Sequence, residues 1–152
     1  MDKLQIDKKL ILDVSIFALM LLGAQLYTNN TPGGLLMVVI LSIIWALLLL
    51  FGAVYLFKSK TFETNIILSV VFGLFLFIIP LSYSFQLFAF PGDILLLSYS
   101  IIIIPLIGIT YIVLFIINRK KRYNNYYFNM LLRIFLLFIT VSISMIYSAP
   151  RL

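Results

Sequence analysis

Five apolar runs, each long enough to cross a lipid bilayer, follow one another along this chain. A membrane-spanning helix needs about 20 apolar residues, because each residue advances about 1.5 Å through roughly 30 Å of hydrocarbon. The third run is interrupted by Pro80 and the fourth by Pro105. The runs cover approximately residues 10–27, 35–57, 66–90, 94–117 and 127–147. They predict an all-α, polytopic membrane protein with about five transmembrane helices.

Composition excludes a soluble monomer. Of the 152 residues, 64% are hydrophobic and 11% are charged, whereas soluble domains have about 45–50% apolar and about 25% charged residues. A soluble domain of this size leaves roughly a third of its unfolded surface exposed, which is too much for so apolar a chain. We therefore expect one integral membrane domain over residues 1–152. The first run is expected to remain as a helix, because no small-x-small cleavage site follows it and signal peptides rarely contain acids such as Asp13.

The basic residues predict the orientation of the chain. Lysines precede the first run and separate the second from the third, and a run of four basic residues, 119–122, separates the fourth from the fifth. The loops at 28–34 and 90–93 hold no basic residue, and only Arg151 departs from the pattern. Five spans put all these clusters on one side, which the positive-inside rule identifies as cytoplasmic. We expect a cytoplasmic N-terminus in a bacterial cytoplasmic (inner) membrane.

The run at 119–122 has two interpretations. Basic residues beside a span attract anionic lipid or an acidic partner, with about 1 kcal/mol for each residue. The orientation of the chain explains the same cluster without any partner. The residues concerned are Arg119, Lys120, Lys121 and Arg122. The tyrosines that follow them, Tyr123, Tyr126 and Tyr127, are expected to anchor at the lipid headgroups.

The chain contains no cysteine and no histidine, which removes most routes to catalysis and cofactor binding. Its own side chains cannot build a disulfide, a thiolate nucleophile, a zinc site or a histidine-ligated haem. The five acidic residues lie near expected helix ends or in loops, so no pair of carboxylates is set up for acid–base work. Membrane orientation, rather than nucleic acid, explains the net charge of +6. We expect no enzyme activity, no cofactor and no nucleic-acid partner.

Two loops on the outer side resemble each other and predict a duplicated helical hairpin. Each follows a Gln-Leu-aromatic sequence and contains a Pro-Gly turn whose proline suits the first turn of the next helix. The two prolines lie 59 residues apart. We expect repeats at 10–60 and 66–122 and an extra helix at 127–147, although Pro-Gly is also an ordinary hairpin turn. The turn residues are Gln25, Pro32, Gly33, Gln86, Pro91, Gly92 and Asp93.

The second of these turns resembles a known family. An apolar helix ending near Gln86, an aromatic-Pro-Gly turn and a Leu/Ile-rich continuation are similar to the membrane hairpin of GldL-type proteins, which are gliding-motility and type IX secretion motor subunits. The resemblance covers Gln86 to Leu97, with an echo at Gln25 to Leu36. The family usually has His-Trp before the Pro-Gly, where this chain has Ala89-Phe90, and no acidic residue lies in the middle of an expected helix here. The resemblance implies a related membrane hairpin rather than a proton-driven stator.

Two ionisable side chains fall inside the expected spans, at a similar depth. Asp13 lies about one turn into the first helix and Arg133 about two turns into the fifth, both counted from the cytoplasmic side. A charge in hydrocarbon is costly and usually meets a partner charge. We hypothesise a structural ion pair between these residues. The alternative is that Arg133 extends to the headgroups while Asp13 stays at the interface.

Polar and small residues inside the other spans are sparse. Ser82, Ser84 and Gln86 follow Pro80, and such a proline-interrupted helix can expose backbone carbonyls to a cavity, as transporter helices do. Prolines are also ordinary in membrane helices. The small residues are expected to mark close helix packing; they are Gly52, Ala53, Gly73 and Gly108.

These observations favour a non-catalytic accessory subunit that packs with and stabilises a larger membrane complex, with a link to secretion or motility implied by the GldL resemblance. The alternative is a small oligomeric transporter, channel or pore-forming effector, whose path would follow the polar residues of the third and fourth spans. An enzyme acting on lipid is disfavoured by the lack of catalytic groups. The expected partners are membrane lipids and either a larger membrane protein or further copies of the chain.

Overall fold

The computed structural model describes residues 8–56, 70–117 and 124–148, and all regular structure in these ranges is helical. Five helices are long and apolar enough to cross a membrane, as the apolar runs predict. α1 spans Lys8–Thr28, α2 spans Gly34–Leu56, α5 spans Asp93–Ile117 and α6 spans Asn124–Ser148. The third candidate span joins a helical stretch at 70–76 to α4, Ile78–Phe88.

The third span is interrupted just ahead of its proline. Residue Phe77 separates the stretch at 70–76 from α4, and Pro80 is buried in the first turn of α4. The backbone of Phe77 is nevertheless helical, with φ of −63° and ψ of −24°, and Phe77 N donates to Gly73 O at 3.0 Å. Pro80 lacks the N–H group that would bond to the carbonyl of residue 76, so it interrupts one span, as the sequence suggests, and does not begin a separate helix.

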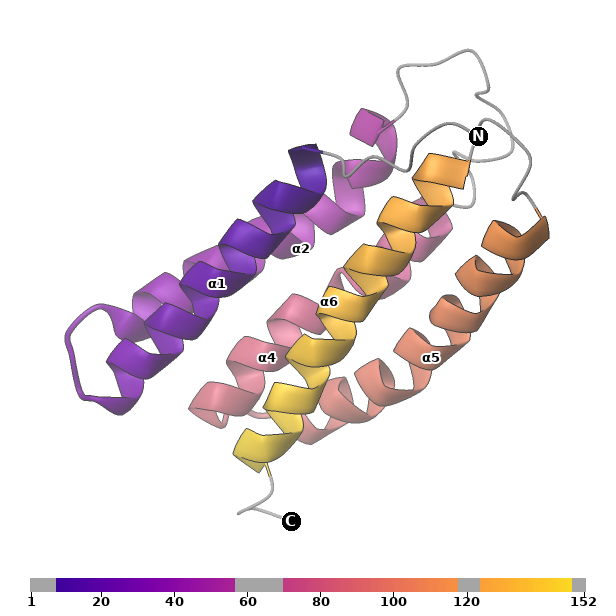
Figure 1. Ribbon diagram of the computed structural model, residues 1–152. Coiled ribbons are helices and arrows are strands. Elements are labelled where there is room, and N and C mark those ends of the chain that lie inside the picture. The colour runs from indigo at the N-terminus through magenta and orange to yellow at the C-terminus, as the bar shows by residue number, and fades with distance from the viewer. Residues whose placement is uncertain (1–7, 57–69, 118–123, 149–152) are drawn as a thin grey trace.

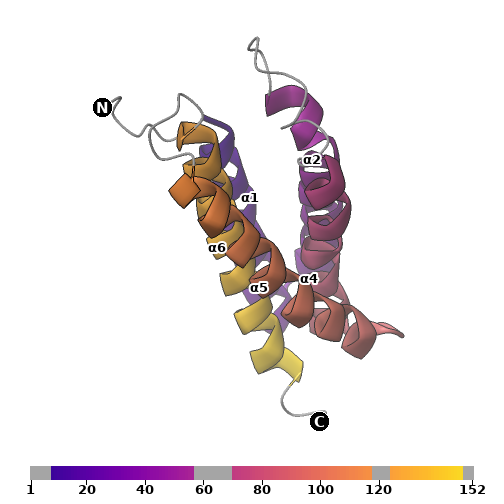
Figure 2. The same cartoon turned by 90° about the vertical axis from the view of Figure 1, so that its right-hand side faces the viewer.

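The helices pack as two antiparallel hairpins and a closing helix (Figure 1). α1 packs along α2, and α4 packs along α5. α4 lies at the centre, in contact with α2, α5 and α6, while α6 also packs along α5 and reaches α1. The turns that join α1 to α2 and α4 to α5 lie at one end of the bundle. Figure 2 shows α5 running along the outside of α4 and α6.

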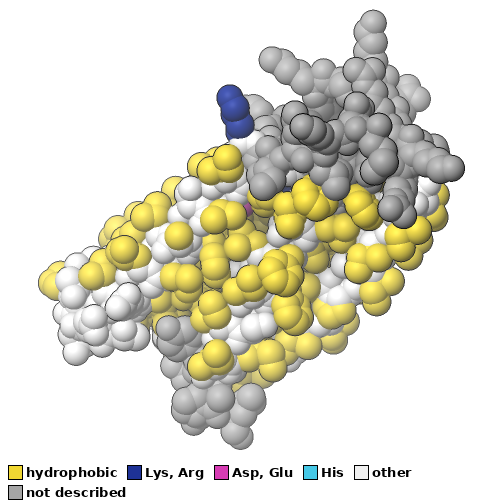
Figure 3. Space-filling view, viewed as in Figure 1, with side chains coloured by type: hydrophobic (Ala, Val, Ile, Leu, Met, Phe, Trp, Pro, Cys, Tyr) yellow, Lys and Arg dark blue, Asp and Glu magenta, His cyan; other side chains and the backbone are white. Residues whose placement is uncertain are grey.

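The outside of the bundle carries many large apolar side chains. Large hydrophobic side chains are exposed on each long helix, including Leu19, Ile44, Ile102 and Phe135. Hydrophobic side chains cover most of the face formed by α1, α6 and α5 (Figure 3). Apolar side chains on both surfaces are expected of helices that pack together within lipid, where burial from water does not sort the residues.

The two interhelical turns have the same backbone structure. Each preceding helix ends on a residue in the left-handed conformation, Asn30 with φ of 55° or Ala89 with φ of 54°. A Pro-Gly turn follows in which Gly33 and Gly92 have φ of 92° and 88°, as in a type II turn. The matched hydrogen bonds run from Thr31 N to Leu26 O and from Phe90 N to Phe85 O, then from Gly34 N to Thr31 O and from Asp93 N to Phe90 O. The helix-ending bond is that of a Schellman motif in both turns.

This geometry corrects two details of the sequence comparison. Every matched pair of residues is 59 apart, so Gln25 corresponds to Ser84 rather than to Gln86. The two glutamines also differ in environment, since Gln25 is exposed and Gln86 is fully buried. The prolines lie before α2 and α5 rather than in their first turns, because each proline forms the type II turn. The predicted repeats at 10–60 and 66–122 include residues outside the described ranges, and their duplication stays a prediction.

The turn geometry predicts a stabilising substitution at Ala89. An L-residue in the left-handed conformation costs roughly 1–2 kcal/mol, part of which glycine recovers. We expect Ala89→Gly to raise the free energy of unfolding by about 0.5–1 kcal/mol, measured by denaturant titration in detergent micelles. Ala18→Gly, in the exposed interior of α1, is the matched control and should lower it by about 1 kcal/mol. Equal losses at both sites would contradict the left-handed cap.

Candidate functional site

The predicted partners Asp13 and Arg133 meet inside the bundle. Nε of Arg133 lies 2.6 Å from Oδ2 of Asp13, and each side chain is only 7% exposed. Asp13 comes from α1 and Arg133 from α6, so the pair joins the first helix to the last. A hydrogen-bonded ion pair gains strength in a low-dielectric interior, where each charge alone would be costly. Burial of both groups excludes the alternative in which Arg133 extends to the headgroups.

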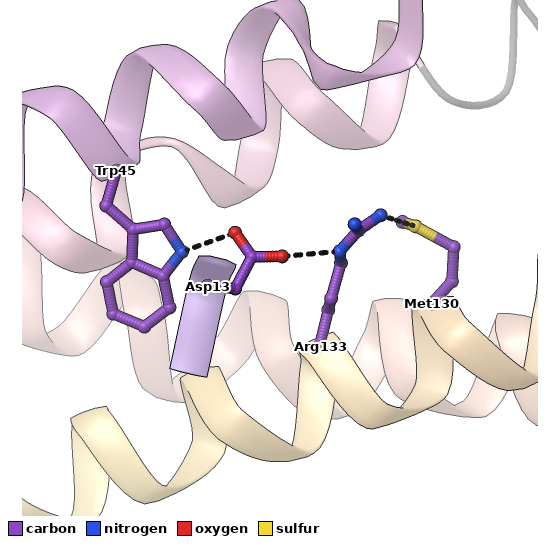
Figure 4. A network of polar contacts seen from close by, with 4 residues as sticks. All are labelled: Asp13, Trp45, Met130 and Arg133. Carbon is purple, nitrogen blue, oxygen red and sulfur yellow. Dashed lines mark hydrogen bonds and ion pairs between the residues drawn. The ribbon is translucent and has the colours of Figure 1, made fainter. Parts of the chain in front are cut away.

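A third residue, Trp45, binds to the same carboxylate. The indole Nε1 of Trp45 donates to Oδ1 of Asp13 at 3.1 Å, so each carboxylate oxygen accepts a hydrogen bond from a different helix. On its other side Arg133 donates from Nη1 to the sulfur of Met130, a weak acceptor at 3.8 Å. Figure 4 shows the Asp13 carboxylate between the Trp45 ring and the Arg133 side chain. Three helices, α1, α2 and α6, therefore meet on one carboxylate.

Sequence reasoning missed Trp45, although a signal was present. It is the chain's only tryptophan and lies in a run without charge. A buried indole N–H requires an acceptor, and α2 forms a hairpin with the helix that carries Asp13. That hairpin brings Trp45 and Asp13 to the same depth.

α6 is tied to the second hairpin by tyrosines. The hydroxyls of Tyr111 in α5 and Tyr126 in α6 lie 3.1 Å apart, within hydrogen-bonding distance. The ring of Tyr111 also packs against those of Tyr127 and Phe72, with centroids 6.3 and 5.0 Å away. Tyr127 is buried, so the prediction that it anchors at the headgroups is wrong. α6 thus bonds to the first hairpin through Arg133 and to the second through its tyrosines.

The polar residues of α4 face the centre of the bundle. Ser82, Ser84 and Gln86 are buried, and the Ser84 hydroxyl accepts a hydrogen bond from that of Ser42 in α2 at 3.2 Å. The Ser82 hydroxyl is buried without a hydrogen-bond partner in the described part of the chain. The structure thus gathers polar side chains of the third span inside the protein and away from lipid.

The two Pro-Gly turns lie side by side. The rings of Tyr27, at the end of α1, and Phe88, at the end of α4, meet edge to face with centroids 4.7 Å apart. In the second turn the Oδ1 of Asp93 accepts a hydrogen bond from Ile94 N at 2.7 Å, where a carboxylate suits the positive end of α5. The other predicted residues of these turns, Gln25, Pro32, Gly33, Pro91 and Gly92, are exposed.

The basic cluster Arg119, Lys120, Lys121 and Arg122 lies outside the described residues. Within the described ranges no group of three histidine, cysteine, aspartate or glutamate side chains is placed to hold a metal ion. The ion pair of Asp13 and Arg133 joins two helices of the bundle. The candidate site is therefore the interhelical network of Asp13, Trp45 and Arg133.

No family model, curated protein or solved structure matches the chain.

Proposed function

We propose that this protein is a small, non-catalytic integral membrane subunit that packs with a larger membrane complex and stabilises it. The observation that carries the proposal is the network of Asp13, Trp45 and Arg133 inside an apolar exterior. The network uses the polar groups of three helices to hold the bundle together. What remains on the outside is hydrophobic helix surface, which can contact lipid or the helices of another membrane protein.

The proposal includes the orientation and the membrane. Lysines and arginines flank the cytoplasmic ends of the expected spans, so the N-terminus lies in the cytoplasm and the C-terminus outside. The two type II turns then face outward. Similarity of the second turn to the GldL-type hairpin favours a bacterial cytoplasmic membrane and a complex that serves secretion or motility.

Affinity purification from the native membrane in mild detergent tests this function. Mass spectrometry should find at least one larger membrane protein in a fixed ratio to this chain. Photo-cross-linkers placed at exposed Leu19 and Ile44 should form adducts with that protein in intact membranes. A cross-linker at Met20, which is buried beside Leu19 in α1, is the matched control and should not. Purification of this chain without any other protein would overturn the accessory role.

A second candidate, an oligomeric transporter or channel, is favoured by the buried polar side of α4. Ser82, Ser84 and Gln86 occupy three positions in its last turns, and Ser82 has no internal bond in the described ranges. Flux through liposomes that contain the purified protein, reduced by Gln86→Leu and not by Gln25→Leu, would favour this candidate over the accessory subunit.

A further inference from the structure

α4 carries two buried serines that face opposite sides of the helix. Ser82 and Ser84 are two positions apart, and residues at that spacing lie about 200° apart around a helix axis. Both side chains are buried. The Ser84 hydroxyl faces α2, where it lies 3.2 Å from that of Ser42. Ser82 therefore faces away from α2, toward the side of α4 on which α5 and α6 pack.

The Ser82 hydroxyl lacks the bond that comparable hydroxyls make. In the described ranges the other buried serines and threonines each place their hydroxyl within hydrogen-bonding distance of a carbonyl oxygen three or four residues earlier in their own helix; they are Ser42, Ser84, Ser100, Thr140 and Ser144. The Ser82 hydroxyl is buried with no hydrogen-bond partner in the part of the chain that the structure describes. A buried hydroxyl without a partner is costly, so this position requires a polar neighbour.

The first hairpin shows which helix Ser82 faces and how closely two helices can approach there. The two turns match at a spacing of 59 residues, so Ser82 corresponds to Gly23 in α1. A Cβ added at Gly23 would lie 3.0 Å from Cγ2 of Val38 and 3.3 Å from Cγ of Met37, both in α2. The corresponding neighbour of Ser82 is α5. Because Ser82 carries a Cβ and a hydroxyl, α4 and α5 must lie farther apart at this position than α1 and α2 do.

Ser100 is the buried polar residue of α5 at this depth. Ser82 lies six residues before the last residue of α4, and Ser100 lies seven residues after the first residue of α5. In an antiparallel hairpin this difference of one residue is about 1.5 Å along the helix axis. The Ser100 hydroxyl donates to the Leu96 carbonyl at 2.8 Å, and a hydroxyl oxygen that donates its hydrogen can still accept a hydrogen bond. α5 therefore offers an acceptor level with the Ser82 donor.

We propose that one water molecule is bound between α4 and α5, where it accepts a hydrogen bond from the Ser82 hydroxyl and donates one to the Ser100 oxygen. Internal waters are held in this way where a polar space offers two or more partners. Two hydrogen bonds of about 2.8 Å let the water join oxygens up to about 5.5 Å apart. Neither serine is charged, so the site suits water rather than an ion. The water links α4 to α5 as the bond between Ser84 and Ser42 links α4 to α2.

Solid-state NMR of the isotopically labelled protein in lipid bilayers detects the water directly. Magnetisation that starts on water should reach the Cβ atoms of Ser82 and Ser100, and Ser82→Ala should abolish the transfer to Ser100. Ser42 is the matched control and should receive none. It is fully buried, lies eight residues after the first residue of α2, and is bonded to Ser84 on the other side of α4. No transfer to Ser82, or equal transfer to Ser82 and Ser42, would overturn the proposal.

Stability is a second test, because a bound water reverses the expected sign. Without the water, Ser82→Ala would remove a hydroxyl that has no partner and would stabilise the protein. With the water, the variant loses a hydrogen bond, and its equilibrium constant for folding should be roughly fivefold lower than that of Ser144→Ala. Ser144 is a buried serine whose hydroxyl bonds to the Thr140 carbonyl of its own helix. Ser82→Ala as stable as Ser144→Ala, or more stable, would overturn the proposal. Only this chain is needed, so the result does not depend on the accessory role.

Discussion

Arg133→Leu should destabilise this protein more than any other single substitution in α6. It takes the positive charge away from the buried Asp13 carboxylate, and removal of one partner of a buried pair costs about 3–5 kcal/mol. Asp13→Leu should cost a similar amount for the converse reason. The double variant should recover most of the loss, because two leucines leave neither member of the buried pair charged. Denaturant titration, followed by the fluorescence of Trp45, measures all three variants.

The single tryptophan makes this cycle specific to the site. Trp45 is 1% exposed and bonds to the carboxylate itself, so its emission should shift in every variant that lacks Asp13. The double variant should retain a deficit of about 1 kcal/mol, since the indole N–H has lost its acceptor. A third change, Trp45→Phe, should reduce that deficit. A double variant no more stable than either single variant would contradict coupling of the two charges.

Gly73→Ala should produce the second large loss. A Cβ added at Gly73 would lie 2.7 Å from the Leu49 carbonyl oxygen and 3.3 Å from that of Leu50 in α2. Both are backbone atoms, so the helices must separate, and overpacking of this kind costs about 1–3 kcal/mol. The free energy of unfolding of Gly73→Ala should fall by about 2 kcal/mol in detergent titration.

Gly108 provides the matched control for that substitution. A Cβ at Gly108 would meet only the Ile134 side chain, at an ordinary 3.6 Å. Gly108→Ala should therefore be neutral or stabilise by up to about 1 kcal/mol, because alanine is the better helix former. Equal losses in the free energy of unfolding at Gly73 and Gly108 would show that the close approach of α2 to residues 70–76 does not cause the loss at Gly73.

The main elements of the fold can be predicted from the sequence. The thickness of the hydrocarbon layer sets the length of each span, and the cost of a charge within that layer limits how the spans can be arranged. Apolar runs of about 20 residues predict the spans, and Asp13 and Arg133 can be paired because they are the ionisable residues at equal depth. The start of α6 at Asn124, ahead of the predicted 127, shows that polar residues also extend a helix beyond its apolar run.

Other features depend on rotation about helix axes, which an apolar pattern in lipid does not specify. An amphipathic period identifies the core face of a soluble helix, but these helices are hydrophobic all round. Gln25 and Gln86 therefore look equivalent in sequence, while the turns pair Gln25 with Ser84. Gly73 and Gly108 also look alike, and only the packing shows which one another helix approaches. The depth of Trp45 can be read from the sequence, whereas the direction of its ring depends on this rotation.

The ion pair connects residues 120 positions apart, and the order of synthesis gives that separation a meaning in time. Ribosomes add about 5–20 residues per second, so Asp13 is made roughly 6–24 s before Arg133. Trp45 emerges early in that interval, so the hydrogen bond within the first hairpin can form long before the ion pair. The growing chain thus carries the Asp13 carboxylate in α1 without the Arg133 guanidinium until α6 is made. The synthesis of α6 adds the opposite charge to a hairpin that already holds the acid.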